Sequence, residues 1–560
     1  MKEASTDHGR SRPPAGIPDP GNSRPEAGGR RLPPGGDDER AVAPHRLDRL
    51  ETAALTALTG LSLIVLAALL TKGRPLSGAD GLLAADQLQY FAWIRESAHH
   101  LLTGNRFDLA PGPRSFLHPG FAVSGGLHAL GLSVPLSYLV WKPVAIGLTF
   151  YGALRYVRRL LDGRGARHAA LILVLFAVMP AAWIVAWTDW GGNPRQFTFD
   201  FISGEMWSGQ YLWGYLMTAI AVFLMPLVLL GLERGKVAPA AAAAFLVCWL
   251  QPWQGATLAL IVLGVGLWRR RVPAGHLAVA LATVPPALYY LLLGRFDPAW
   301  ELASKSNAAG AMPEWSWPWW AVALTLAPLA VPAALAYRLP APGWQEKAVR
   351  VWPLAAVVVY LLPFGTFPYH AFQGLAIPLS ILAVQGMLTV WRRPSPLAVA
   401  GLLFLMTVPG IAHKLEVSVH SIRSAGDPFW IFDGEVRALR FIERDPRPGG
   451  VLGPVYAGYM LPYTTGRETW IGALSWTPDW RGRQRKADGL VDGRLRGRAA
   501  QDFVLSTRAR YVFVDCRPRL RDLEPELGPI LAEVRRFGCA SVYVLRDRPD
   551  MVRAAGLPDE

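Results

Sequence analysis

The chain has 560 residues, of which 52% are hydrophobic and only 18% are charged. Soluble domains usually carry about 25% charged residues, and many apolar runs here approach the roughly 20 residues that cross a bilayer. We therefore predict an α-helical polytopic membrane protein. The net charge of +15 does not indicate nucleic acid, because much of it lies in short loops beside apolar runs, as in cytoplasmic loops, and no recognition motif accompanies it.

Residues 1–44 are rich in Pro, Gly, Arg and Asp and contain almost no large apolar side chains. Such a segment cannot bury enough surface to fold, so we predict a disordered tail. It is too long and too acidic for the charged region of a signal peptide, and no small-residue cleavage site follows the first apolar run. That run is expected to remain as the first span, with the tail in the cytoplasm.

The basic residues of the loops assign a side of the membrane to each later run. The run 237–268 has basic flanks at both ends and a polar break at 251–255. We predict a hairpin of two short helices there, with a re-entrant pair lining a cavity as the alternative. In all we expect about 11 transmembrane helices in a GT-C-like domain covering 45–412, with a large first outer loop at 72–132. The runs predicted as spans are 50–70, 134–157, 169–187, 211–232, 237–268, 276–293, 317–336, 351–364, 372–391 and 397–411.

Residues 413–560 differ in character, because charged stretches alternate there with compact runs. We predict a small extracytoplasmic α/β domain, since an odd number of crossings places it opposite the N-terminal tail. The predicted strand-like runs are 449–461, 468–474, 509–516 and 539–545, and the predicted helices are 436–444 and 526–537.

Three cysteines exclude a disulfide scaffold. Cys248 lies in an apolar run and is expected to be a small buried hydrophobe. Cys516 and Cys539 can pair if their domain faces an oxidising compartment, but spacing alone does not decide it. The chain has no CxxC or His-rich spacing that indicates a structural metal.

The stretch 78–102 combines carboxylates, aromatic residues and histidines beside the first span. Wound as a helix at about 100° per residue, it places Asp86, Tyr90, Trp93, Ser97 and His100 on one stripe. Such a helix is expected at the membrane surface with its polar, aromatic face turned inward. The alternative is an interfacial helix that only fills a loop.

Further candidates lie in loops assigned to the outer side. Carboxylates among aromatic rings suit a sugar site, because rings stack on pyranoses while acids bind hydroxyl groups; anchoring at the interface is the alternative role of such rings. We find no nucleotide-binding or hydrolase signature and no central acids of the kind that relay protons in transporters. The outer-loop candidates are Asp80, Glu96, His99, His100, Asp108, Arg114, His118, Asp189, Arg195, Asp200, Glu205, Asp297, Glu301, Lys305, Glu314, Tyr369, His370 and Gln373.

Three stretches together resemble GT-C glycosyltransferases, which are polytopic and use polyprenyl-phosphate-linked sugars. They are DQLQY at 86–90, YHAFQGLAIPLSILAV at 369–384 and GYMLPYTTGRETWIGALSWTPDW at 458–480. Two positions depart from the family pattern. Gln87 stands where a second acid is common, and Gly472-Ala473 stands where Gly-His is familiar.

The resemblance implies that Asp86 is the general base for an acceptor hydroxyl and that a single displacement inverts the anomeric carbon. It implies a cation for the leaving phosphate, from Arg195, His370, Arg95 or a divalent ion, with no cofactor certain. The substrate-binding residues that it implies are Tyr90, Trp93, Asp189, Arg195, Asp200, Glu205, His370, Gln373 and Arg467.

We therefore predict a plasma-membrane enzyme, a hexosyl or pentosyl transferase acting on the outer face. Its expected partners are a polyprenyl-phosphate-linked sugar, an envelope glycan, lipid or protein acceptor and the bilayer. Two alternatives stay open: a lipid or polysaccharide transporter, and a non-catalytic GT-C-like scaffold, which the two departures favour.

Overall fold

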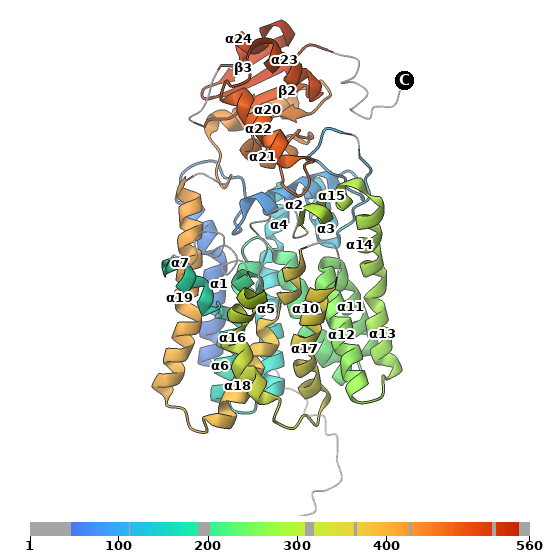
Figure 1. The fold of residues 1–560 in the computed structure, drawn as a ribbon, viewed down its shortest axis with the longest axis vertical. Coiled ribbons are helices and arrows are strands. Elements are labelled where there is room, and N and C mark those ends of the chain that lie inside the picture. Colours follow the sequence, from blue (N-terminus) through green and yellow to red (C-terminus); the bar gives the residue numbers. More distant parts are fainter. Residues whose placement is uncertain are drawn as a thin grey trace, which may run out of the picture. The chain divides into compact units, whose positions relative to one another are not determined.

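The computed structural model describes residues 46–110, 112–188, 202–307, 319–362, 367–424, 428–517 and 522–547. The chain divides into two units, residues 1–48 and residues 49–560, and the second contains every element below. The predicted tail, residues 1–44, lies outside the described residues. Within the second unit, a helical bundle carries a small mixed domain at one end (Figure 1).

The elements of the bundle and its loops follow the chain from residue 49 to residue 424. They are α1 (Arg49–Leu70), α2 (Ala84–Ser97), α3 (Pro119–Ala129), α4 (Val134–Leu139), α5 (Trp141–Leu160), α6 (Arg164–Phe176), α7 (Pro180–Thr188), α9 (Ser208–Tyr211), α10 (Leu216–Glu233), α11 (Val237–Leu250), α12 (Pro252–Trp268), α13 (Ala274–Ala282), α14 (Val284–Phe296), α15 (Pro298–Asn307), α16 (Trp319–Ala336), α17 (Trp344–Leu361), η2 (Pro368–Phe372), α18 (Ala376–Val390) and α19 (Pro396–Ser424).

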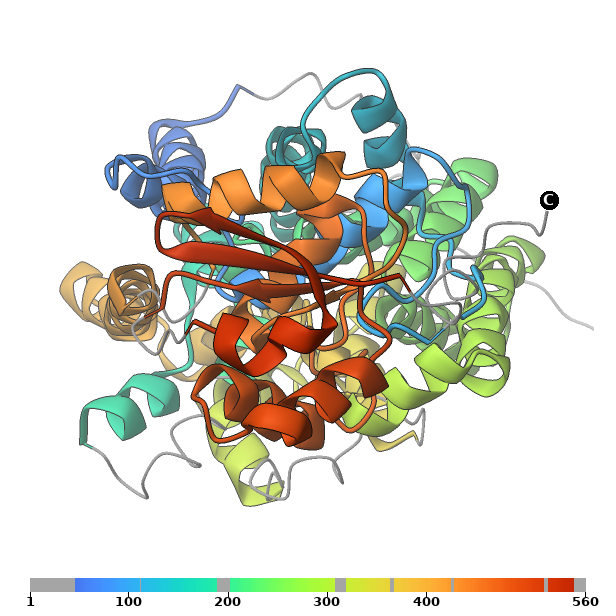
Figure 2. The same ribbon diagram turned by 90° about the horizontal axis from the view of Figure 1, so that it is seen from above.

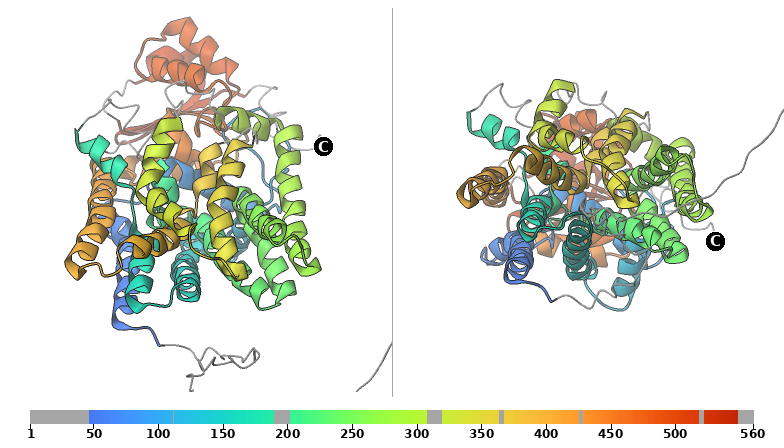
Figure 3. Two further views of the ribbon diagram at one scale, coloured as in Figure 1. Left: turned by 60° about the horizontal axis from the view of Figure 1, so that its bottom comes forward. Right: turned by 90° about the horizontal axis from the view of Figure 1, so that it is seen from below.

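In the described part of the chain, five helices are long and apolar enough to cross a membrane: α1, α10, α13 with α14, α16 and α19. The apolar helices α11, α12 and α18 are shorter. Seen from below, the long helices appear nearly end-on, so their axes run in similar directions (Figure 3). α10 is buried over 72% of its most apolar window, against 22–33% for the other four. It is therefore the central helix, and the others expose apolar side chains as lipid-facing helices do. The predicted number of 11 crossings stays a prediction.

Two predicted runs show how proline divides a helix. The run 237–268 is two helices, as predicted, because Gln251 is extended and Pro252 opens α12. The predicted single span 169–187 was wrong, since α6 ends at Phe176 and α7 begins at Pro180. Proline has no amide hydrogen to continue the helix, and it disfavours helical backbone just before it.

The C-terminal domain contains a four-stranded sheet of order β1-β2-β4-β3, in which β1 and β2 are parallel and the other pairs antiparallel. α20 packs against β3 and β4, and α22 and α23 contribute to the apolar core over β1, β2 and β4. The sheet is thus covered on both sides (Figure 2). Its elements are α20 (Asp433–Arg444), β1 (Val451–Leu452), α21 (Val455–Thr465), α22 (Trp480–Val491), α23 (Gly497–Ser506), β2 (Tyr511–Val514), α24 (Glu524–Leu527), η3 (Gly528–Ile530), β3 (Leu531–Phe537) and β4 (Ala540–Leu545).

The α/β class is confirmed, but three of its predicted elements were wrong. The run 468–474 forms no strand and only a single bridge, between Thr469 and Val451. The run 449–461 is strand only at β1 and continues as the helix α21. The predicted helix 526–537 is mostly the strand β3. Its residues suit a helix, but Pro529 interrupts the run and pairing with β4 along a hairpin at Gly538 stabilises the extended form. Tertiary pairing therefore overrides local propensity here.

Cys516 and Cys539 form a disulfide, a pairing that their spacing did not decide. The bond closes a loop across a sequence separation of 23. Replacing both cysteines with serine is expected to cost about 3 kcal/mol of unfolding free energy, because the unfolded chain regains the entropy of that loop. Thermal unfolding of the oxidised protein and of the double variant measures this. Equal stability of the two proteins would contradict the expectation.

Asp515 is a buried carboxylate at the end of β2, with 2% of its surface exposed. Burial raises its pKa from 3.8 to about 6, and the charge of Glu435 adds to the effect, while the backbone N–H and the charge of Arg517 oppose it. The folded state therefore binds more protons than the unfolded state between these two values, so stability falls as the pH rises through that window.

Asp515→Asn cannot ionise, and it keeps an oxygen to accept from the Arg517 N–H, a bond of 3.1 Å. The variant is expected to be more stable than the wild type by about 2–3 kcal/mol at pH 7 and by almost nothing near pH 4. Unfolding midpoints at the two pH values test this, and an equal gain at both would show that ionisation is not the cause.

Candidate active site

A cavity of about 630 Å³ lies where α2, α3, α4 and α15 meet the ends of α10, α12 and α14. These loop elements lie between the bundle and the C-terminal domain (Figure 1). The walls of the cavity are mainly aromatic and aliphatic, with a few polar side chains, as in typical ligand sites. The lining residues used below are Tyr90, Trp93, Phe116, His118, Phe121, Tyr215, Thr218, Gln251, Tyr290, Arg295, Trp300, Glu301, Lys305 and His370.

Asp86 lies in the first turn of α2, where the N-terminal end of a helix stabilises negative charge. Its Oδ2 accepts a hydrogen bond of 2.7 Å from the hydroxyl of Tyr215, which immediately precedes α10. Tyr215 itself lines the cavity. Tyr215, the residue before the central helix α10, therefore holds the predicted base Asp86 at the edge of the cavity.

The next turns of α2 supply the aromatic wall, as the predicted stripe requires. Tyr90 stacks on Phe121 with centroids 5.2 Å apart, and Trp93 meets Phe116 edge-on at 4.9 Å. Trp476 of the C-terminal domain lies 5.2 Å from Trp93, so that domain packs against this wall. The predicted partners Ser97 and His100 do not extend this wall into the cavity.

The pKa of Tyr90 is affected by two carboxylates. Burial raises its pKa well above 10, and the charges of Asp86, Tyr138 and Glu205 raise it further, in that order. The phenol therefore stays protonated as a neutral hydrogen-bonding group. Both Asp86 of loop one and Glu205 of loop two act on this one ring, so the two predicted acids belong to one neighbourhood.

Glu205, His370 and Gln373 form a second polar group, with Glu205 only 4% exposed. Glu205 Oε2 accepts from Gln373 Nε2 at 2.7 Å and lies 3.1 Å from His370 Nδ1. Gln251, the extended residue between α11 and α12, donates to Gln373 Oε1 at 2.8 Å. Since His370 and Gln251 line the cavity, this chain connects a buried carboxylate to its wall.

Cationic side chains lie at another part of the lining. Arg295 at the end of α14 and Lys305 on α15 both line the cavity. Lys305 pairs with Glu301 at 2.6 Å, and both side chains are largely exposed. A third basic residue, His118, caps α3 and is buried, which lowers its pKa to about 4. It is therefore neutral near pH 7, so the positive charge here comes from Arg295 and Lys305.

No family model and no curated protein matches the chain. It is similar to solved structures of the oligosaccharyltransferase AglB from Archaeoglobus fulgidus in complex with an inhibitory peptide and a dolichol-phosphate, at 14% identity over 84% of this chain and 69% of that chain, with a TM-score of 0.40. It is also similar to ArnT from Cupriavidus metallidurans bound to undecaprenyl phosphate, at 14% identity over 91% and 98% of the two chains, with a TM-score of 0.44. The likeness is distant, and no residue role is carried over from it.

Four predicted substrate-binding residues are not among those that the structure places at this cavity. Asp189, Arg195 and Asp200 are outside the described residues. Arg467 donates to the backbone carbonyls of Ile442, Arg447, Asp445 and Gly449 and lies over the ring of Tyr511. These contacts are those of a residue that holds its own domain together, and Arg467 does not line the cavity.

Gln87 and Asp80 have structural contacts as well. Gln87 Oε1 accepts from the N–H groups of Asp80 and Gly81, and its Nε2 donates to Asp80 Oδ1 at 2.9 Å. Asp80 is fully buried and ion-paired with Lys142. The amide at position 87 therefore holds the turn before α2 in a way that an acid could not, because a carboxylate has no N–H to donate.

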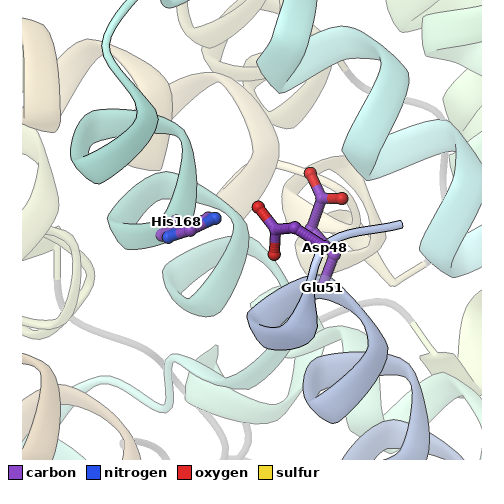
Figure 4. A group of neighbouring side chains, drawn as sticks. All are labelled: Asp48, Glu51 and His168. Carbon is purple, nitrogen blue, oxygen red and sulfur yellow. The ribbon is translucent and has the colours of Figure 1, made fainter. Parts of the chain in front are cut away.

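Carboxylate and imidazole side chains are the groups in this chain that could hold a divalent cation. Near the cavity Glu205 could bind such an ion, and this role stays a prediction. Elsewhere, Glu51 of α1 and His168 of α6 offer ligand atoms within 4.8 Å of one another (Figure 4); Asp48, also drawn there, belongs to the first unit. Glu51 is ion-paired with Arg158 of α5. On the same helix, Lys142, the partner of Asp80, lies 16 residues from Arg158, or about 24 Å along the axis.

The sequence did not single out Tyr215, Gln251, Trp300 or Trp476 as members of this site. Gln251 carried a signal as the polar break in an apolar run, and Trp476 lies in the stretch 458–480 that carries the resemblance. Tyr215 lies 129 residues from Asp86 in the sequence, and no periodicity relates positions so far apart. Such contacts depend on helix packing alone.

Proposed function

We propose that the chain is a membrane glycosyltransferase that moves a sugar from a polyprenyl-phosphate donor to a cell-envelope acceptor. The observation that supports this most is the cavity of about 630 Å³ with Tyr90 and Trp93 in its wall and Asp86 bonded at its edge through Tyr215. An aromatic wall binds the faces of sugar rings, and a positioned carboxylate serves as general base.

The proposed step is a single displacement. Asp86 accepts the proton of an acceptor hydroxyl while that oxygen forms a bond to the anomeric carbon. The bond from that carbon to the phosphate oxygen breaks, and its electron pair leaves with the polyprenyl phosphate. Attack from the face opposite the leaving group inverts the anomeric carbon. The Tyr215 hydroxyl, 2.7 Å from Asp86 Oδ2, holds the base in place.

The leaving phosphate needs a nearby positive charge as it departs. Arg295 and Lys305 line the cavity, and we propose them for this role, with His370 as a further donor. Arg195 stays a candidate. Arg95 is not used, because it bonds to Glu443 and to the carbonyls of α21. A divalent cation, if bound through Glu205, would supply the same charge stabilisation.

The site is proposed to face the outside of the plasma membrane, with the N-terminus in the cytoplasm and residues 413–560 extracytoplasmic. Basic loops support this orientation. The disulfide between Cys516 and Cys539 supports an oxidising location for that domain.

Purified protein in lipid nanodiscs, supplied with a panel of labelled polyprenyl-phosphate sugars and an envelope glycan fraction, tests the proposal. We expect release of polyprenyl phosphate together with label in the acceptor, and an inverted anomeric signal by NMR. Folded protein that releases no polyprenyl phosphate from any donor would overturn it. Movement of an intact donor across a proteoliposome membrane without transfer would support the transporter instead.

A further inference from the structure

A groove of about 880 Å³ lies on the C-terminal domain, between α20 and the edge strand β3. It is not used by the proposed transfer chemistry. Its lining is unusually basic, with five arginines against two carboxylates, which leaves three positive charges. The lining residues are Arg437, Arg440, Phe441, Arg444, Asp445, Pro446, Arg447, Glu533, Arg535 and Phe537.

Both elements present these residues by their own periodicity. Arg437, Arg440 and Arg444 follow i, i+3, i+7 spacing, which places them along one side of α20. On β3, Glu533, Arg535 and Phe537 alternate onto one face of the sheet. Arg536 points to the other face, where it pairs with Asp522 and Glu524.

Two of the arginines are neutralised and three are not. Arg447 pairs with Asp445 and Glu533, and Arg535 pairs with Glu533. Arg437, Arg440 and Arg444 are exposed, and within the described ranges no carboxylate lies within ion-pair distance of them. Arg437 makes only a long bond of 3.5 Å to the carbonyl of Phe537. These three guanidinium groups therefore have capacity for an external anion.

The shape and the spacing select among anions. Arg437 and Arg444 are separated by about 10 Å along the helix axis, too far for one phosphate to meet both. Anionic groups repeated along a chain match three guanidinium groups spaced along one helix. Phe441 and Phe537, with centroids 5.7 Å apart, add ring surface to the floor, which sugar faces can contact.

We propose that this groove binds an anionic sugar chain, with carboxylate or phosphate groups along its length that pair with Arg437, Arg440 and Arg444. Guanidinium groups bind both kinds of anion by paired N–H bonds. The binding does not depend on the transfer reaction, so it can be measured whether or not the proposed function holds.

The test is binding of an oligogalacturonate of defined length to the full chain in detergent, measured by calorimetry. R437Q/R440Q/R444Q is expected to weaken binding by about 10- to 100-fold, and added salt should weaken wild-type binding. The matched control is R485Q/R494Q/R498Q, which removes the same charge from exposed positions of the same domain and should bind as the wild type does. Asp86→Asn protein should also bind normally.

Three outcomes would overturn the proposal. Equal loss in the groove variant and in the control would mean that only net charge matters. Equal affinity for a neutral oligosaccharide of the same length would exclude charge recognition. Binding of inorganic phosphate or of phosphatidylglycerol vesicles that the groove variant abolishes, with no oligogalacturonate binding, would assign the groove to a single anion or to lipid.

Discussion

Asp86→Asn is expected to lower the rate of sugar transfer by about 10²- to 10⁴-fold, the usual contribution of a general base. The amide keeps the size and the acceptor oxygen that the Tyr215 hydroxyl bonds to at 2.7 Å, but it cannot take a proton at neutral pH. Donor binding should therefore change little while kcat falls. Initial rates with a labelled donor, together with donor affinity, measure the two effects separately.

A second variant asks whether Asp86 acts through proton transfer. Tyr215→Phe removes a donor from the carboxylate, so it should raise the pKa of the base and move the acid limb of the pH–rate profile to higher pH. Asp502→Asn, at an exposed carboxylate of the C-terminal domain, is the control and should leave rate and profile unchanged. Full activity in Asp86→Asn would remove this residue as the base.

Lys142→Met is expected to destabilise the protein by about 3–5 kcal/mol, because it leaves a buried carboxylate without its countercharge. Asp80 has no exposed surface, and Lys142 also donates to the carbonyl of Ser62 at 2.9 Å. Unfolding in a fixed detergent, followed by circular dichroism against temperature, reports the loss.

The double variant Lys142→Met with Asp80→Asn should recover part of the stability, because the uncompensated charge is gone and Gln87 still has an acceptor. Lys305→Met breaks an ion pair whose side chains are 73% and 47% exposed, and should cost no more than about 1 kcal/mol. If the single and double Lys142 variants were equally unstable, charge burial would not explain the effect.

Local patterns predicted those parts of the fold in which neighbours in sequence are neighbours in space. Tyr90 and Trp93 share a face of α2 because helical spacing requires it, and the polar break at Gln251 predicted two short helices. The strand β3 was misread because its pairing with β4 outweighs its own helical preference. Pro180 indicated a break before α7, but the continuous hydropathy of the run 169–187 led to the prediction of a single span.

The site was predictable only in part, for the same reason. The helical stripe grouped Asp86 with Tyr90 and Trp93, and the family resemblance named it as the base. Glu205, His370 and Gln373 could be named from polar clusters in loops. Their assembly depends on contacts across long sequence separations, such as Gln373 to Glu205 across 168 residues. Arg467 occupies a motif position, yet its four backbone carbonyl partners are visible only in the folded domain.

Helix α2 carries the base at one end and is fastened to the C-terminal domain at the other. Arg95 donates to the carbonyls of Tyr463 and Thr464 and pairs with Glu443 at 2.8 Å. Just beyond α2, Arg106 pairs with Glu468. The chain therefore cannot be cut after Ser424 into a self-sufficient membrane half and a detachable outer half. Removing the outer half would strip two arginines of their partners and uncover Trp93, so the bundle would lose the support that orients Asp86.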